Sequence, residues 1–218
     1  MITVPYAVKK IIERSRYLSE AMSKGLINLS SLARYMKPEV EDMLVKEVSE
    51  ASIIMALKRL ETELKPQMKY KDVFKTAPEM IVRSNLVEFT LSKSEDLRKQ
   101  LLKIFEIYSN HQKYFFALTE GITETTIIAS RDLYNKIEEI IIKEKVTSEF
   151  HNLSSITIRL PKEITYTPGV VYFFLKSLSW EGVNVMEVVS TYLELTIILE
   201  DKDVNHAFAI LKSLFDNT

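Results

Sequence analysis

The 218-residue sequence predicts an α+β protein in which a helical N-terminal domain precedes two ferredoxin-like modules. Apolar residues recur at helical spacing up to residue 64, and the alternation typical of half-buried strands begins only after Pro66. From residue 86 the order strand, helix, strand, strand, helix occurs twice, over about 65 residues each time. We therefore expect a helix-turn-helix-like domain at 1–85, a first module at 86–152 and a second module at 153–218.

The N-terminal domain is predicted to consist of helices that begin at capping residues or prolines. One helix is expected over residues 5–23, because its apolar positions follow the helical period. The expected starts of the later helices are Asn28 or Ser30, Pro38, and Ser49. After Pro66, the segments "MKYKDVF" and "EMIVRSN" should form a short hairpin, or wing.

The two modules are predicted from alternating strands and capped amphipathic helices. In the first module the expected strands are 86–92, 113–120, 123–130 and 146–153, with helices at 94–111 and 131–145. In the second module the expected strands are 154–160, 184–190 and 192–200, with helices at 169–181 and 202–215. The second module lacks a last strand. Its sheet edge should therefore be completed by the other module or by a second chain, and we expect a homodimer.

Composition excludes several classes of function. The sequence has no Cys, which excludes disulfides and thiol chemistry, and no signal peptide or membrane span is apparent, so a cytoplasmic protein is expected. Its four glycines are isolated, so neither a phosphate loop nor a dinucleotide fingerprint is present. His111, His151 and His206 share no ligand spacing, and no nucleophile stands beside a base. We expect no metal, no cofactor and no catalysis.

A possible ligand site lies where a strand meets a helix in "TPGVVYFFLKSLSWEGVNV", which "YLELTIILEDKDVNHAFAILKSLF" follows. These segments resemble the ACT domain, a ligand-binding module of amino-acid metabolism that occurs in tandem in aspartokinase-like proteins. The resemblance implies an amino-acid ligand. The site residues that it implies are Thr167, Pro168, Gly169 and Val170, with Asn184 and Val185 on a turn expected to face them.

Two departures from the ACT pattern bear on this site. Many amino-acid-binding members have Asn or Asp two residues before the proline, where this chain has Tyr166. The first module has "SKSEDL" at its junction and no Pro-Gly pair. A glycine lets a ligand approach the backbone amides at a helix start, but the same pair can form a sharp turn that binds nothing. Both interpretations remain open from the sequence.

The segments "INLSSLARYM" and "VSEASIIMALKRLE", joined by "KPEVEDMLVKE", resemble a winged helix-turn-helix. The resemblance implies DNA binding through the last helix, with Ser49, Ser52, Lys58 and Arg59 as contacts. Residues 1–85 carry 15 Lys and Arg against 11 Asp and Glu, a modest net charge of +4. The alternative is a helical domain for packing or dimerisation, which the acidic residues of the last helix favour.

Together these features predict a non-catalytic regulator that senses an amino acid or a similar metabolite through its ACT-like modules. Its output would be DNA binding by the N-terminal domain. The alternative is a protein-interaction subunit that regulates an enzyme of amino-acid metabolism and binds neither ligand nor DNA itself.

Overall fold

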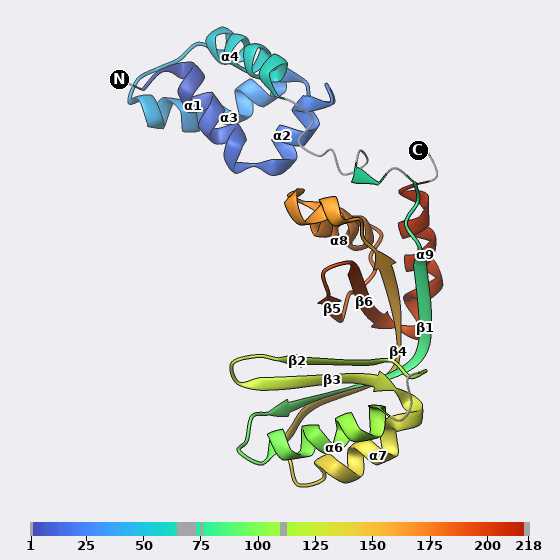
Figure 1. Ribbon diagram of the computed structural model, residues 1–218. Helices are drawn as coiled ribbons and strands as arrows, with labels where there is room; N and C mark the ends of the chain where they lie inside the picture. Colours follow the sequence, from blue (N-terminus) through green and yellow to red (C-terminus); the bar gives the residue numbers. More distant parts are fainter. Residues whose placement is uncertain (1, 65–72, 75, 110–112, 216–218) are drawn as a thin grey trace. The chain divides into compact units, whose positions relative to one another are not determined.

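The computed structural model describes residues 2–64, 73–74, 76–109 and 113–215 (Figure 1). The chain divides into two compact units, Met1–Lys69 and Tyr70–Thr218. Each unit has a hydrophobic core of its own. None of the helices in the described ranges is long and apolar enough to cross a membrane.

The described part of the first unit is helical. Its helices are α1 (Val4–Arg14), α2 (Arg16–Ser23), α3 (Leu29–Leu44) and α4 (Glu50–Glu63). Two predicted caps are confirmed: the Asn28 side chain accepts hydrogen bonds from the amides of Ser30 and Ser31, and Ser49 Oγ accepts one from Ser52. The core formed by α1, α3 and α4 includes Val8, Ile12, Met36, Ile53 and Leu57.

Two predicted helix boundaries in this unit are wrong. The helix expected over residues 5–23 is broken at Ser15, whose side chain caps α2 by accepting a hydrogen bond from Leu18. Pro38 does not begin a helix but lies inside α3. A proline in a helix interior costs about 3 kcal/mol. Burial of Met36 and Val40 on either side of Pro38 offsets this cost.

The predicted wing falls partly on residues 65–72 and 75, which lie outside the described residues. Its second arm is not part of a wing, because residues 80–85 belong to the first strand of the second unit. A strand that pairs with a segment about seventy residues away cannot be distinguished from a local hairpin by its alternation alone.

The second unit contains one six-stranded antiparallel sheet, with the order β2-β3-β1-β4-β6-β5. Its strands are β1 (Met80–Ser92), β2 (Phe116–Glu120), β3 (Glu124–Ser130), β4 (Val146–Arg159), β5 (Glu187–Ser190) and β6 (Glu194–Glu200). Its helices are α6 (Leu97–Ser109), α7 (Tyr134–Ile141), α8 (Val170–Trp180) and α9 (Val204–Ser213). Single 3-10 turns precede α7 (Arg131–Leu133), α8 (Lys162–Tyr166) and α9 (Asp201–Asp203). The predicted mixed fold with repeated strand-helix-strand-strand-helix order is confirmed here.

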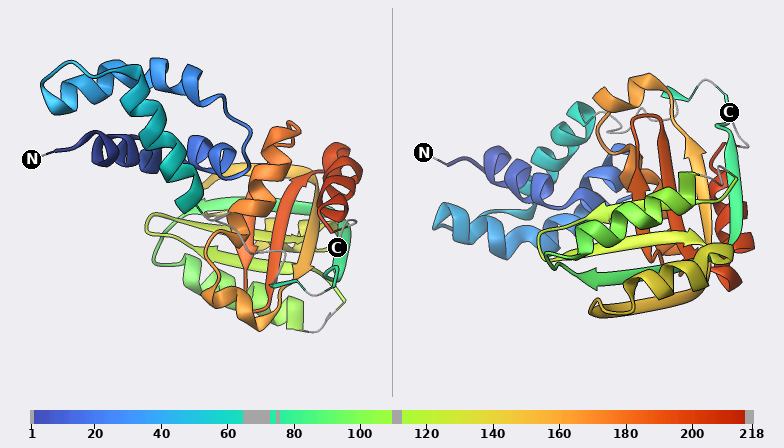
Figure 2. Two further views of the ribbon diagram at one scale, coloured as in Figure 1. Left: turned by 90° about the horizontal axis from the view of Figure 1, so that it is seen from above. Right: turned by 60° about the horizontal axis from the view of Figure 1, so that its bottom comes forward.

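The long strands β1 and β4 are shared by both modules (Figures 1 and 2). The beginning of β1, Met80–Arg83, pairs with the end of β4, whereas Leu86–Leu91 pairs with the beginning of β4. The strand missing from the second module is therefore supplied from a segment that precedes the first module. The predicted boundaries at residues 85 and 152 fall within these two strands, next to the left-handed residues Asn85 (φ 59°) and Asn152 (φ 54°).

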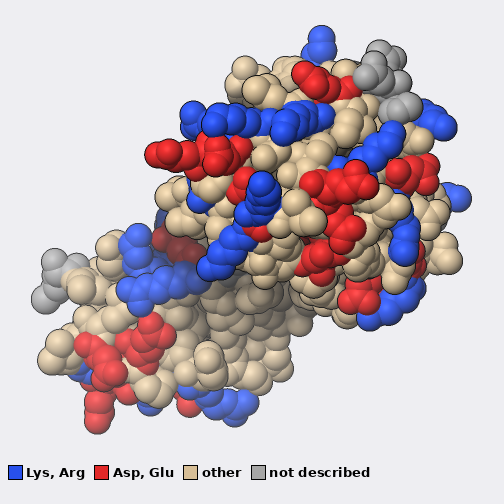
Figure 3. All heavy atoms as spheres, turned by 90° about the horizontal axis from the view of Figure 1, so that it is seen from below, with Lys and Arg blue, Asp and Glu red and all other residues tan. Residues whose placement is uncertain are grey.

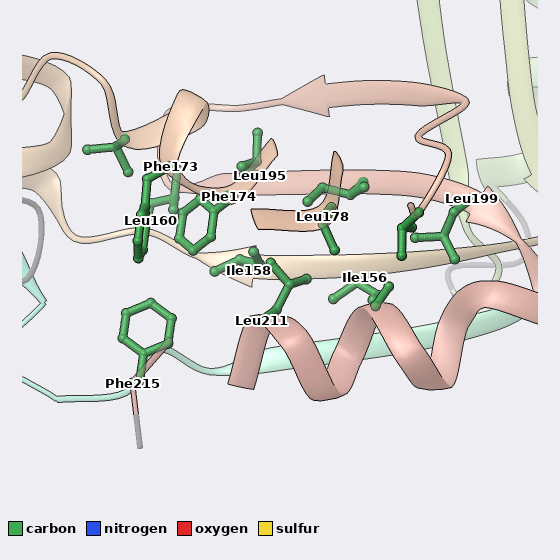
Figure 4. Packing of buried hydrophobic residues seen from close by; sticks show 14 of the residues in the cluster. Ile156, Ile158, Leu160, Phe173, Phe174, Leu178, Leu195, Leu199, Leu211 and Phe215 are labelled. Atoms are coloured by element: carbon green, nitrogen blue, oxygen red, sulfur yellow. The ribbon is translucent and has the colours of Figure 1, made fainter. Parts of the chain in front are cut away.

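Each module packs its two helices on one face of its strands. In the second module, α8 and α9 cover β4 and β6 through Phe174, Leu178 and Leu211 (Figure 4). In the first module, α6 and α7 lie together on one side of β1 and β3 (Figure 2) and bury Leu101, Ile104 and Ile137. The sheet face turned away from these helices, here called the open face, carries Leu86, Ile128, Leu153 and Ile198 in a separate buried cluster.

Candidate ligand-binding site

The two modules place equivalent strand-to-helix junctions beside equivalent hairpins. In the first module the junction joins β1 to α6, and the amide of Lys93 donates to the carbonyl of Thr123 at 2.9 Å. In the second module the junction joins β4 to α8, and the amide of Leu160 donates to the carbonyl of Leu193 at 2.8 Å. The end of each strand is thus held against the tip of the β2–β3 or the β5–β6 hairpin.

The predicted ligand residues of the second module form a tight turn. Gly169 precedes the first residue of α8 with φ of 89°, a left-handed conformation that favours glycine. Thr167 donates its hydroxyl to the carbonyl of Glu163, and the side chain of Val170 is buried in the module core. The glycine is therefore required by the backbone conformation of the turn, whether or not a ligand binds there.

Asn184 and Val185 do not face this junction within their own module. They follow the end of α8, and the 11 residues of that helix separate them from Gly169 by about 16 Å. Asn184 Nδ2 donates to Met186 Sδ at 3.3 Å, and Val185 packs against the module core. The expectation of a facing turn is corrected by helix geometry, because a helix carries the chain to the opposite end of the sheet.

The first module has a cavity at its junction. The cavity measures about 580 Å³ and lies between the start of α6 and the β2–β3 hairpin. Its lining residues are Lys93, Ser94, Glu95, Leu97, Arg98, Leu101, Glu120 and Thr125. None of the predicted site residues lines it. In the sequence, "SKSEDL" differs from the ACT pattern by lacking Pro-Gly, but its charged residues of both signs are a signal for a polar site.

Hydrogen bonds fix the shape of this junction. Ser94 Oγ accepts the amide of Leu97 at 3.0 Å and donates to Glu144 Oε2 at 2.7 Å. The first bond caps α6, and the second ties the junction to the segment that leads into β4. Leu97 and Leu101 are buried and give the cavity an apolar side.

The rim of the cavity carries charges of both signs. Lys93 Nζ lies 2.7 Å from Glu120 Oε1. The hydrogen bond from Lys93 and its charge hold the pKa of Glu120 below its usual value, and the charge of Arg98 acts in the same direction. With Glu95, the rim thus presents two cations and two carboxylates around an apolar wall. Such a set can bind both ends of a zwitterion.

A second cavity, of about 550 Å³, lies on the open face of the second module near the β5–β6 hairpin. It is lined by Glu79, Ile81, Thr157, Arg159 and the segment from Thr191 to Glu194. Arg159 Nη1 and Glu79 Oε2 form an ion pair of 3.3 Å across it. The predicted junction residues Thr167 to Val170 do not line this cavity either.

The predicted DNA contacts lie on α4. Ser49 and Ser52 are engaged in the cap, with their hydroxyl oxygens 2.8 Å apart. Lys58 and Arg59 are exposed, and Arg59 Nε lies 3.6 Å from Glu63 Oε1. On the face of the molecule in Figure 3, positive and negative side chains are interspersed.

Among the described residues no group of three or more His, Asp or Glu side chains could hold a metal ion. His111 lies outside those residues. His151 Nε2 lies 2.8 Å from Glu149 Oε1 on β4, and His206 lies on α9. The three histidines were not expected to share a site.

Comparisons with known proteins support the fold. No protein-family model matches the chain, and no curated protein matches its sequence. Among solved structures it is similar to the aspartate kinase of Clostridium acetobutylicum, with a TM-score of 0.54 and 18% identity over 65% of this chain and 35% of that one. The chain thus matches about a third of the length of that enzyme.

Two further similar structures are separate regulatory subunits. The regulatory subunit of aspartate kinase from Thermus thermophilus gives a TM-score of 0.51 at 10% identity, over 65% of this chain and 100% of that one. The corresponding subunit from Thermus flavus gives 0.50 at 11% identity, again over 65% and 100%. The second unit therefore has the fold of an aspartate kinase regulatory subunit, as the resemblance to ACT domains implied.

Proposed function

We propose that this protein is a non-catalytic regulator that binds a free amino acid at the junction of its first module. The observation that carries the proposal is the cavity of about 580 Å³ at the start of α6, with paired charges on its rim and an apolar wall. The similarity to regulatory subunits of aspartate kinase supports the same class of function.

The chemistry of the cavity fits an α-amino acid. The ligand carboxylate would be bound by the first amides of α6 and by Arg98, since a helix start and a guanidinium both favour an anion. Glu95 or Glu120 would accept the ammonium group. Leu97 and Leu101 would contact an apolar side chain, so we expect a neutral amino acid to bind more tightly than a charged one.

Arg98→Ala provides the test of this site. A thermal-shift screen of the common amino acids should find a ligand, because a compound at 100 times its Kd stabilises a protein by about 2.7 kcal/mol. Arg98→Ala should abolish that shift. Lys99→Ala is the matched control, since Lys99 lies next in α6 and pairs with Asp96 rather than lining the cavity. A wild-type protein that responds to no amino acid would contradict the proposal.

The junction of the second module is proposed as a further, weaker site. Its contacts would be the residues from Thr167 to Val170, with the backbone amides at the start of α8 as donors. Asn184 and Val185 could join this site only from another module or another subunit, because they lie at the other end of α8. A homodimer that brings two such ends together is part of the proposal, and light scattering of the purified chain tests it.

DNA binding is the proposed output of the first unit. Its contacts would be Lys58 and Arg59, with Ser49 and Ser52 at the start of α4. The test is binding to random duplex DNA at low and high salt, because phosphate contacts weaken steeply with salt. Absence of binding at low salt would reject this output and leave the sensing site untouched.

A regulatory subunit of an amino-acid-metabolism enzyme is the second candidate, and the exposed surface of α8 favours it. Trp180 is 68% exposed, and Tyr172 lies about two turns earlier on the same helix. Lys176 Nζ lies 4.3 Å from the centre of the Trp180 ring. Exposed aromatic residues of this kind are enriched at protein interfaces. Loss of a co-purifying enzyme on Trp180→Ala would support this candidate. An enzyme that is still retained would count against it.

A further inference from the structure

The open face of the sheet holds a carboxylate that the proposed ligand site does not use. Glu88 on β1 is only 4% exposed. Its Oε2 atom has no hydrogen-bond partner among the described residues. A buried polar group without a partner destabilises the fold, so its retention here calls for a physical role.

The register places Glu88 and Ser155 at equivalent positions of the two modules. Glu88 lies opposite Ile128 of β3, and Ser155 lies opposite Ile198 of β6. Ser155 Oγ is likewise buried without a partner in the described part of the chain. One strand further out, Ile198 lies opposite Glu187 of β5. Each module thus contributes one carboxylate to the same row of its open face.

The two open faces pack against each other. The buried cluster on this side combines Leu86 and Ile128 of the first module with Leu153 and Ile198 of the second. Residues of the two edge strands, among them Ala117 and Val189, pack around it. Glu88 therefore lies at a contact between modules.

Only one titratable group among the described residues acts on Glu88. Its neighbours across the strands, Ile128 of β3 and Phe150 of β4, carry no charge. That group is Glu187 of β5, in the second module. Burial, and then the charge of Glu187, raise the pKa of Glu88 to about 7. No cation of the described residues lowers the pKa of Glu88.

The backbone offers a place for the modules to move. Asn85 and Asn152 are left-handed residues in the two strands that connect the modules, and the β1–β4 register shifts between Arg83 and Leu86. Asparagine tolerates this conformation, and a break in the ladder leaves the strands free to bend there.

We propose that the contact between the open faces of the two modules is controlled by protonation of Glu88. With the proton bound, a neutral side chain faces Glu187 and the modules pack closely. Loss of the proton places two carboxylates at the same apolar contact, and the modules separate by bending at Asn85 and Asn152 so that water reaches Glu88. This control operates without the amino-acid site.

Distance measurement between the modules tests this proposal. The chain has no Cys, so Leu102→Cys on α6 and Ser179→Cys on α8 can each carry one spin label. Both positions are exposed. In the full chain, the population with the longer distance between the two spin labels should increase severalfold between about pH 5.5 and about pH 8.5. The midpoint should lie near the pKa of Glu88.

Variants distinguish this control from a general effect of pH. Glu88→Gln keeps the shape without the charge, and its distances should match the short population at both pH values. Glu187→Gln should keep the transition but lower its midpoint, because the charge of Glu187 raises the pKa of Glu88. This variant tests the proposal if Glu88→Gln fails to fold. Glu149→Gln on β4, which accepts a hydrogen bond from Tyr134 on the helix side, is the control and should behave as the parent. Identical distances at both pH values, or an unchanged transition in Glu88→Gln, would overturn the proposal.

Discussion

The two modules share one topology and two strands, but they begin their first helices differently. In the first module, Ser94 caps α6 beside a cavity with charges of both signs. In the second, a 3-10 turn leads into Gly169, and Val170 and Phe174 enter the core at once. The comparison teaches that topology makes the junctions equivalent in position, whereas a capping serine begins the helix in one and a left-handed glycine begins it in the other.

The open faces show the same division of roles. The equivalent positions Glu88 and Ser155 differ in charge, so only the first module places a titratable group in its own central strand there. At this position of the central strands, the first module therefore carries a carboxylate where the second carries a hydroxyl. The predictions below test this asymmetry, beginning with the largest expected effect.

Core truncation should show how much more the second module depends on its helix. Phe174 of α8 and Leu101 of α6 both lie four residues after the first residue of their helices, and both are buried. Phe174→Ala should lower the free energy of unfolding by about 3–5 kcal/mol and Leu101→Ala by about 2–4 kcal/mol. Urea denaturation measures both. A larger loss of unfolding free energy for Leu101→Ala than for Phe174→Ala would contradict the greater dependence of the second module on its helix.

The stability of the second unit should depend on pH through Glu88. Its pKa is about 7 in the folded chain and near its ordinary value of 4.5 when unfolded. Between these values the folded state binds more protons, so the free energy of unfolding falls as pH rises from about 4.5 to about 7 and then levels off.

Glu88→Gln should remove this pH-dependent loss of stability. The variant should be more stable than the parent by about 2–3 kcal/mol near pH 8 and equal to it near pH 4. Denaturation at several pH values gives the difference, and Ser155→Ala in the second module should leave the pH dependence unchanged. Parallel pH profiles for parent and Glu88→Gln would argue against a buried, protonated Glu88.

The helix starts should respond to different substitutions. Gly169→Ala should destabilise the chain by about 1–2 kcal/mol, because a Cβ is strained at φ of 89°. Ser94→Ala should cost about 1 kcal/mol through loss of the α6 cap. Thermal unfolding measures both changes. If Gly169→Ala is neutral, the left-handed turn that we assign to the second junction is wrong.

The sequence predicts the local elements well and the shared strands poorly. Asn28, Ser49 and the alternation of residues 86–92 indicate helix starts and a strand because each signal is local. The pairing of Met80–Arg83 with the end of β4 leaves no local signal, since only the folded sheet brings these segments together. The same reason hid the electrostatic effect of Glu187 on Glu88.

The cavity that carries the proposed site lies in the module for which the sequence indicated no site, for a related reason. Pro168 and Gly169 form a recognisable pair, but their conformation serves the turn itself. The cavity of the first module depends on Glu120 and Thr125 from the β2–β3 hairpin, which lie far along the chain from Lys93 and Arg98. Helix geometry also separates Asn184 from Gly169, which spacing in the sequence does not reveal.

Amide hydrogen exchange with and without the amino acid found in the screen tests the central claim most directly. If the first module binds the ligand, the amides from Leu97 to Leu101 at the start of α6 should exchange more slowly in its presence. The amides from Val170 to Phe174 at the start of α8 should change little. Protection confined to α8, with α6 unchanged, would contradict the assignment of the ligand site to the first module.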